Sequence, residues 1–185
     1  MKKIYIVLSQ SYSMLAKTIK LFTKDKYSHI SISFDEDCTN MYSIGRKYKY
    51  WPFVWKYMNE SIYKGLYSIS PRAEILIYEL SISDEQYENI KRLLDEYGIS
   101  CKGYNFLGLV LAIFNKKINR RKYYCSEFIY KILSDDSVKL FGKTKKIVKP
   151  MDFEKIENLK FVYEGKIIDY KLKKLPTLNL LDKVI

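Results

Sequence analysis

The hydrophobic and polar positions in the first half of the chain follow patterns that predict β-strands. From residue 28 the sequence SHISISF alternates strictly, so the isoleucines share one face of a strand and His29 shares the other face with two serines. An apolar run at 3–8 is typical of a short buried strand. Further strands are predicted at 41–46, as the hairpin partner of the SHISISF strand, and at 73–80.

Other segments carry apolar residues at the three- and four-residue spacing of helices. The clearest covers 83–98, where Ser83 and Gln86 suit a capping box at the start and Gly98 marks the end. The remaining elements are helices at 11–22, 103–117, 125–133 and shortly after Pro150, and a hairpin over 160–172 that turns at Glu164–Gly165. Strands and helices are mixed without a regular βαβ alternation, which favours an α+β fold.

An aromatic-rich stretch interrupts these elements. Six of the ten residues from Tyr48 to Tyr57 are aromatic, and Pro52 breaks any regular element there. These rings suit a lid or an acyl-chain groove, and packing into the core is the equal alternative. Because lysines stand among them, the stretch also suits a peripheral contact with a membrane surface.

Length and charge narrow the class of protein. At 185 residues we expect a single domain, 1–185, with a full hydrophobic core. The net charge of +12 invites a nucleic-acid or anionic-surface partner, but the lysines also suit routine solvated positions. The sequence contains no zinc finger, no RNP-like aromatic motif and no convincing helix-turn-helix, so we expect no nucleic-acid partner.

The cysteine and histidine counts limit the chemistry. Three cysteines without a C-x-x-C pair argue against a disulfide framework or a structural zinc site, and a single histidine excludes a metal site with several histidine ligands. We expect no metal and no organic cofactor. The N-terminus lacks the features of a signal peptide, and no apolar stretch approaches the length of a membrane span, so the expected location is cytoplasmic.

Cys125 is the strongest candidate for a nucleophile. It opens the predicted helix CSEFIYKIL on its apolar face, and a basic run precedes it. Backbone N–H groups and the helix dipole at such a position stabilise an anion, and the thiolate is the reactive form of cysteine. The alternative is that Cys125 is a buried packing residue, which is the commoner role of a cysteine on an apolar face.

A cysteine nucleophile requires a base, and His29 is the only imidazole in the chain, 96 positions upstream. It lies on the polar side of the SHISISF strand, so a helix packed across that face would place Cys125 over His29. The alternative for His29 is a hydrogen-bonded and partly buried residue with no role in chemistry. Cys38 and Cys101 are expected to be ordinary thiols.

These two motifs together resemble a known superfamily. YYCSEFIYKIL resembles the nucleophile helix of the NlpC/P60 superfamily. The order of YSHISISF first and YYCSEF about a hundred residues later, with YNFLG before the cysteine, resembles its circularly permuted branch, the YiiX/YaeF-like and LRAT-like papain-fold proteins. The matched segments run from Lys3 to Arg46 and from Tyr104 to Leu133, with weaker agreement around KPMDF.

The resemblance implies a circularly permuted papain-like fold, with an antiparallel sheet packed against the nucleophile helix. It implies a cysteine peptidase or amidase in which Cys125 is the nucleophile and His29 the base. The third residue, which orients the imidazole and is often acidic in this branch, maps onto Ser43 in the strand 41–46. Glu74 and Asn40 are fallback candidates, and Tyr104 would line the substrate cleft or pack in the core.

The implied function is hydrolysis or acyl transfer on an amide, such as a peptide, a cell-wall-type peptide or a lipid amide, through an acyl-enzyme. Two alternatives stay open. One is a catalytically silent binding module on the same fold, because Ser43 carries no charge to stabilise an imidazolium. The other is a basic peripheral protein that binds an anionic membrane or nucleic acid. The oligomeric state is left undetermined.

Overall fold

A computed structural model describes residues 1–10, 25–46, 55–100, 125–136, 138, 140 and 148–181. Several predictions therefore lie outside the described residues. They concern the helices at 11–22 and 103–117, the aromatic stretch up to residue 54, the candidate cleft residue Tyr104, and Cys101, which is expected to be an ordinary thiol.

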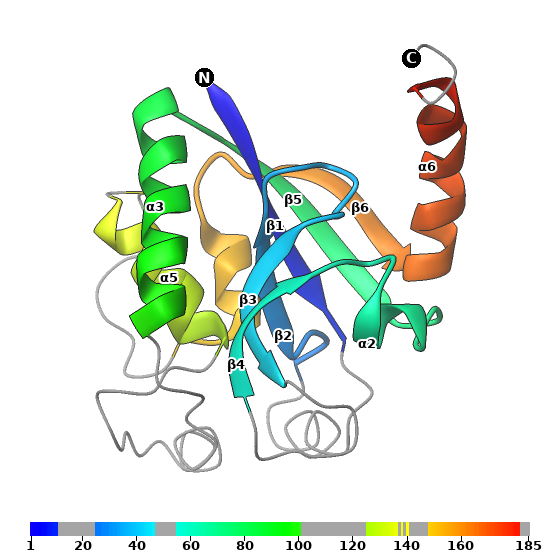
Figure 1. Ribbon diagram of the computed structural model, residues 1–185, viewed down its shortest axis with the longest axis horizontal. Helices are drawn as coiled ribbons and strands as arrows, with labels where there is room; N and C mark the ends of the chain where they lie inside the picture. Colours follow the sequence, from blue (N-terminus) through cyan, green and yellow to red (C-terminus); the bar gives the residue numbers. More distant parts are fainter. Residues whose placement is uncertain are drawn as a thin grey trace.

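An antiparallel sheet organises the described part of the chain (Figure 1). Its six strands are β1 (Lys2–Ser9), β2 (His29–Ser33), β3 (Met41–Arg46), β4 (Trp55–Glu60), β5 (Glu74–Ile82) and β6 (Lys160–Lys166). They lie in the order β4-β3-β2-β1-β5-β6, and each neighbouring pair is antiparallel. The N-terminal strand therefore occupies the centre, and β4 and β6 form the edges.

Four of these strands were predicted from the sequence, and the structure confirms them as β1, β2, β3 and β5. The predicted hairpin turn at Glu164–Gly165 is wrong. Both residues lie inside β6, where Gly165 pairs with Ile75 and Glu164 with Leu76, and the chain then enters a helix at Ile167. The sequence pattern also missed β4, because Pro52 and the aromatic residues hid the strand that begins at Trp55.

Helices cover both faces of this sheet. They are α2 (Gly65–Ser68), α3 (Asp84–Ser100), α5 (Cys125–Asp135), the 3-10 helix η1 (Pro150–Lys155) and α6 (Ile167–Leu181). The capping box of α3 is confirmed, because Ser83 Oγ accepts from the Gln86 N–H at 3.0 Å and Gln86 Oε1 accepts from the Ser83 N–H at 3.1 Å. Gly98 does not end α3, which is described as far as Ser100. Among the described helices, none has the length and apolarity to cross a membrane.

The alternation of the strands produces two hydrophobic layers, one on each face. On the first face α3 and α5 pack over the sheet, and the fully buried residues include Ile6, Ile30, Ile32, Phe128 and Ile129. On the second face α6 packs at the β5–β6 end, and the buried residues include Val7, Met41, Ile77, Ile167 and Tyr170. The α+β class and the packing of the Cys125 helix against an antiparallel sheet are therefore present.

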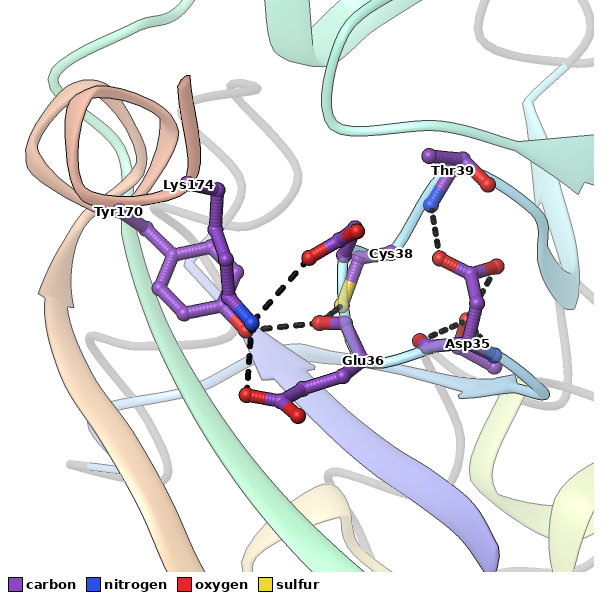
Figure 2. A network of polar contacts seen from close by, with 8 residues as sticks. Asp35, Glu36, Cys38, Thr39, Tyr170 and Lys174 are labelled. Atoms are coloured by element: carbon purple, nitrogen blue, oxygen red, sulfur yellow. Dashed lines mark hydrogen bonds and ion pairs between the residues drawn. The ribbon is translucent and has the colours of Figure 1, made fainter. Parts of the chain in front are cut away.

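Polar contacts fix α6 to the turn between β2 and β3 (Figure 2). Tyr170 Oη donates to the backbone carbonyl of Glu36 at 2.7 Å, and Lys174 Nζ contacts Glu36 Oε1 at 2.6 Å and Asp37 Oδ1 at 3.1 Å. Cys38 lies beneath these contacts, fully buried, and its thiol donates to the Glu36 carbonyl at 3.6 Å. Burial raises the pKa of this thiol, so Cys38 is a structural cysteine as expected.

Phe128 holds α5 against the sheet, so its truncation should destabilise the protein strongly. Phe128→Ala leaves a cavity in the first-face layer, and we expect the free energy of unfolding to fall by about 3–5 kcal/mol. Phe161→Ala is the matched control, because that ring is 59% exposed, and it should cost less than about 1 kcal/mol. Urea denaturation measures both changes, and equal losses would contradict this account of the core.

Candidate active site

His29 lies at the end of β2, where the described pairing joins β2 to β1 but not to β3. It is the first residue of β2 and pairs with Ser9, the last residue of β1. The described pairing of β2 with β3 starts only at Ile32, opposite Tyr42. The His29 ring therefore lies at an open end of the sheet, and its side chain is 15% exposed.

A carboxylate holds this ring. His29 Nε2 lies 3.0 Å from Oε2 of Glu60, the last residue of β4, whose side chain is only 9% exposed. Ser31 Oγ donates to the same carboxylate oxygen at 3.0 Å and lies 3.4 Å from His29 Nε2. The alternation predicted that Ser31 and His29 share a face, and the structure brings them together on Glu60.

Cys125 is the first residue of α5 that the structure describes, and its side chain is buried. The helix packs on β2 and β3. It does so over the face of Ile30 and Ile32, whereas the prediction used the face that the alternation gives to His29. The physical reason is that the isoleucine face must be buried. The Cys125 thiol is still close enough to the His29 ring to contribute to its raised pKa.

The pKa of His29 depends on burial and on two neighbours, Glu60 and Cys125. Burial alone lowers this pKa, because it penalises the charged imidazolium. The negative charge of Glu60, a hydrogen bond with Cys125 and the hydrogen bond with Glu60 outweigh burial, so the pKa lies well above its ordinary value. The Glu60 carboxylate therefore makes the ring a stronger acceptor for a proton from the neighbouring thiol.

The structure corrects the predicted role of Ser43. Its hydroxyl is buried and donates to the backbone carbonyl of Ile30 at 2.7 Å, so it bridges the two strands where their ladder is not formed. The fallback residues are also occupied elsewhere. Glu74 pairs with Lys26 at 3.2 Å, and Asn40 donates to Thr39 Oγ1 at 3.1 Å. Glu60 is the residue that contacts the imidazole.

Sequence reasoning missed Glu60 because it missed β4. The resemblance placed the orienting residue on the strand that follows the histidine strand, and Glu60 lies one strand further on, opposite Met41. A usable signal existed in the isolated acid at the end of WKYMNE, a strand of mixed polarity. Reading that segment as an edge strand would have placed Glu60 beside the predicted hairpin.

Tyr67 of α2 extends the polar network behind Glu60. Its hydroxyl lies 3.0 Å from Ser9 Oγ, and burial, followed by the charge of Glu60, raises its pKa well above the ordinary value. A pocket of about 270 Å³ opens beside Glu60 and Tyr67. The pocket is lined by Thr39, Asn40, Met58, Asn59, Glu60, Ser61, Lys64, Gly65 and Tyr67. The site therefore adjoins a space that a small group can enter.

The overall fold is similar to that of a solved protein. The crystal structure of the metalloprotein YiiX from Escherichia coli O157:H7, a DUF1105 protein, aligns with a TM-score of 0.60 and 15% sequence identity. The alignment covers 89% of this chain and 98% of that chain. This similarity confirms the predicted likeness to YiiX-type proteins at the level of the fold. No protein-family model matches the sequence, and no curated protein matches it.

YiiX is described as a metalloprotein, so the metal-binding side chains of this chain are of interest. Among the residues that the structure describes, no group of three or more His, Cys, Asp or Glu side chains is arranged to hold a metal ion. His29 and Glu60 contact each other directly, as an ion pair does. The described side chains therefore do not fit a metal centre.

The role of Glu60 can be measured on the only histidine of the chain. Glu60→Gln removes the negative charge that opposes the effect of burial, so the pKa of His29 should fall to or below its ordinary value of about 6.5. A proton NMR titration follows this ring without assignment. Glu79→Gln is the control, because that buried acid pairs with Lys3 instead and should leave the titration unchanged. An unaltered titration in Glu60→Gln would contradict the pairing.

Proposed function

We propose that this protein is a thiol-dependent hydrolase or acyltransferase that acts on an amide through an acyl-enzyme at Cys125. The observation that carries the proposal is the position of the only imidazole, held between the Glu60 carboxylate and the Cys125 thiol. A nucleophile, a base and a group that orients the base are the three parts that covalent acyl transfer needs.

The proposed fold is the circularly permuted papain-like arrangement. Its supports are the chain order, with the histidine strand β2 before the nucleophile helix α5, and the YiiX-like fold. The permutation changes the order of the elements along the chain but keeps the cysteine helix and the histidine strand adjacent in space.

In the first step the Cys125 sulfur attacks the carbonyl carbon of the amide. The thiol proton passes to His29, and since Nε2 already faces Glu60, Nδ1 is the nitrogen left for this transfer. The carbonyl oxygen becomes an oxyanion, which backbone N–H groups in the first turn of α5 would stabilise. The C–N bond then breaks, and His29 gives its proton to the departing amine, which leaves a thioester on Cys125.

In the second step a new nucleophile resolves the thioester. Water gives hydrolysis, and an alcohol or amine gives acyl transfer. His29 takes the proton of that nucleophile as it attacks, and the proton returns to the Cys125 sulfur as the C–S bond breaks. The Glu60 carboxylate keeps the ring oriented throughout and stabilises each imidazolium state.

The identity of the third residue bears on the silent-module alternative. That alternative was motivated by an uncharged Ser43 in the orienting position. Glu60 supplies a charged partner and favours a working site over a silent one. The substrate would be a peptide or another small amide, with its polar groups directed to the pocket beside Glu60 and Tyr67.

An activated acyl ester tests the acyl-enzyme directly. Brief exposure to a p-nitrophenyl ester, followed by intact-mass and peptide-mass analysis, should show one acyl group on Cys125. His29→Ala should slow this acylation by on the order of a hundredfold, because the thiol loses its base. Cys125→Ser should abolish the adduct.

Cys38 is the internal control in the same digest. It is fully buried and its pKa is raised, so it should stay unmodified in the native protein. Acylation of Cys38 or Cys101 as fast as Cys125, or equal rates in the wild type and His29→Ala, would overturn the proposed function.

A further inference from the structure

The outer side of α6 presents apolar side chains to solvent. Six large hydrophobic residues of the described chain are exposed, and three of them lie on this helix. They are Ile168, Leu172 and Leu175, which are 37%, 57% and 44% exposed. Their i, i+4, i+7 spacing places them in one stripe along roughly 60° of the helix circumference. We call this stripe the α6 outer face.

The inner side of α6 is already occupied. Ile167 and Tyr170 are fully buried in the second-face layer, and Tyr163 packs its ring 4.7 Å from the Tyr170 ring. The helix is therefore apolar on two sides, and the described part of the chain covers only the inner side. An exposed apolar stripe of this kind marks a surface that another partner covers.

The helix is held rigidly enough to present that stripe. Figure 1 shows α6 standing at one edge of the fold, away from α3 and α5. Lys174 and Tyr170 point from it to the Glu36 turn, where their contacts of 2.6–3.1 Å fix its rotation (Figure 2). Docking of the outer face therefore requires no rearrangement of the sheet.

Basic residues accompany the stripe. Lys166 and Lys173 are exposed at the start and in the middle of the segment. Lys171 is next to the stripe around the helix, and its Nζ lies 5.4 Å from the centre of the Tyr63 ring. Asp169 is the acidic residue described on the helix, and Lys174 is neutralised by Glu36 and Asp37. The whole chain carries a net charge of +12. A long lysine side chain beside an apolar stripe can keep its ammonium at the level of lipid headgroups.

We propose that the α6 outer face docks this protein on an anionic phospholipid surface. Ile168, Leu172 and Leu175 insert at the boundary between headgroups and acyl chains, and the flanking lysines contact the anionic headgroups. A neutral protein surface would satisfy the apolar stripe equally well but would not match the exposed Lys166 and Lys173 or the overall positive charge. This surface is separate from the candidate active site on β2, β4 and α5.

Vesicle co-sedimentation tests the proposal with the full chain. The wild type should bind vesicles of phosphatidylglycerol and phosphatidylcholine, bind pure phosphatidylcholine vesicles far less, and release as the salt concentration rises. Leu172→Asp together with Leu175→Asp should weaken binding to the anionic vesicles by at least about tenfold. Lys171→Glu together with Lys173→Glu should weaken it while leaving every apolar residue in place.

Phe161→Asp is the matched control. Phe161 is an equally exposed apolar residue, but it packs with Tyr78 on the opposite face of the sheet, so its variant should bind like the wild type. Circular dichroism establishes that each variant is folded. Equal binding of the double leucine variant and the wild type, or no preference for anionic vesicles, would overturn the proposal. So would a dimer that the leucine variant dissociates, because the stripe would then be an interface between two copies.

Discussion

The buried contact between Glu60 and His29 is the interaction on which the candidate site depends. An imidazole taken out of water loses its charge unless an opposite charge compensates. Glu60 supplies that charge at 3.0 Å, and Ser31 shares its carboxylate, so the ring keeps both a fixed orientation and a raised pKa. Without Glu60, burial would lower the pKa of the ring, and the ring would lose its carboxylate partner.

The strand order makes this contact available. β2 and β4 are separated by β3, so a direct ladder cannot bring residue 29 to residue 60. The described ladder between β2 and β3 stops at Ile32, and Ser43 bonds to the Ile30 carbonyl across the open end. That opening allows the Glu60 side chain to reach His29 and Ser31 of β2 on one face of the sheet. On the other face, α5 packs against Ile30 and Ile32.

The sequence predicted the parts of this arrangement that follow from local periodicity. Strict alternation identified β2 and the shared side of His29 and Ser31, and the Ser83–Gln86 pair identified the start of α3. It did not predict Glu60 or the face on which α5 packs. Both depend on contacts between elements far apart in the chain, and β4 carries too irregular a pattern to be identified alone. The turn predicted at Glu164–Gly165 was wrong for a related reason. These two residues are typical of a turn, but their pairing with β5 makes them part of the strand β6.

The central claim is that Glu60 acts on Cys125 through His29, and a double-mutant cycle of Cys125 alkylation tests it most directly. Iodoacetamide rates at Cys125 would be compared in the wild type, Glu60→Gln, His29→Ala and the double variant. If the three residues form one unit, Glu60→Gln slows alkylation in the wild type but has no further effect once His29 is absent. Independent, multiplicative effects of the two substitutions would contradict the account.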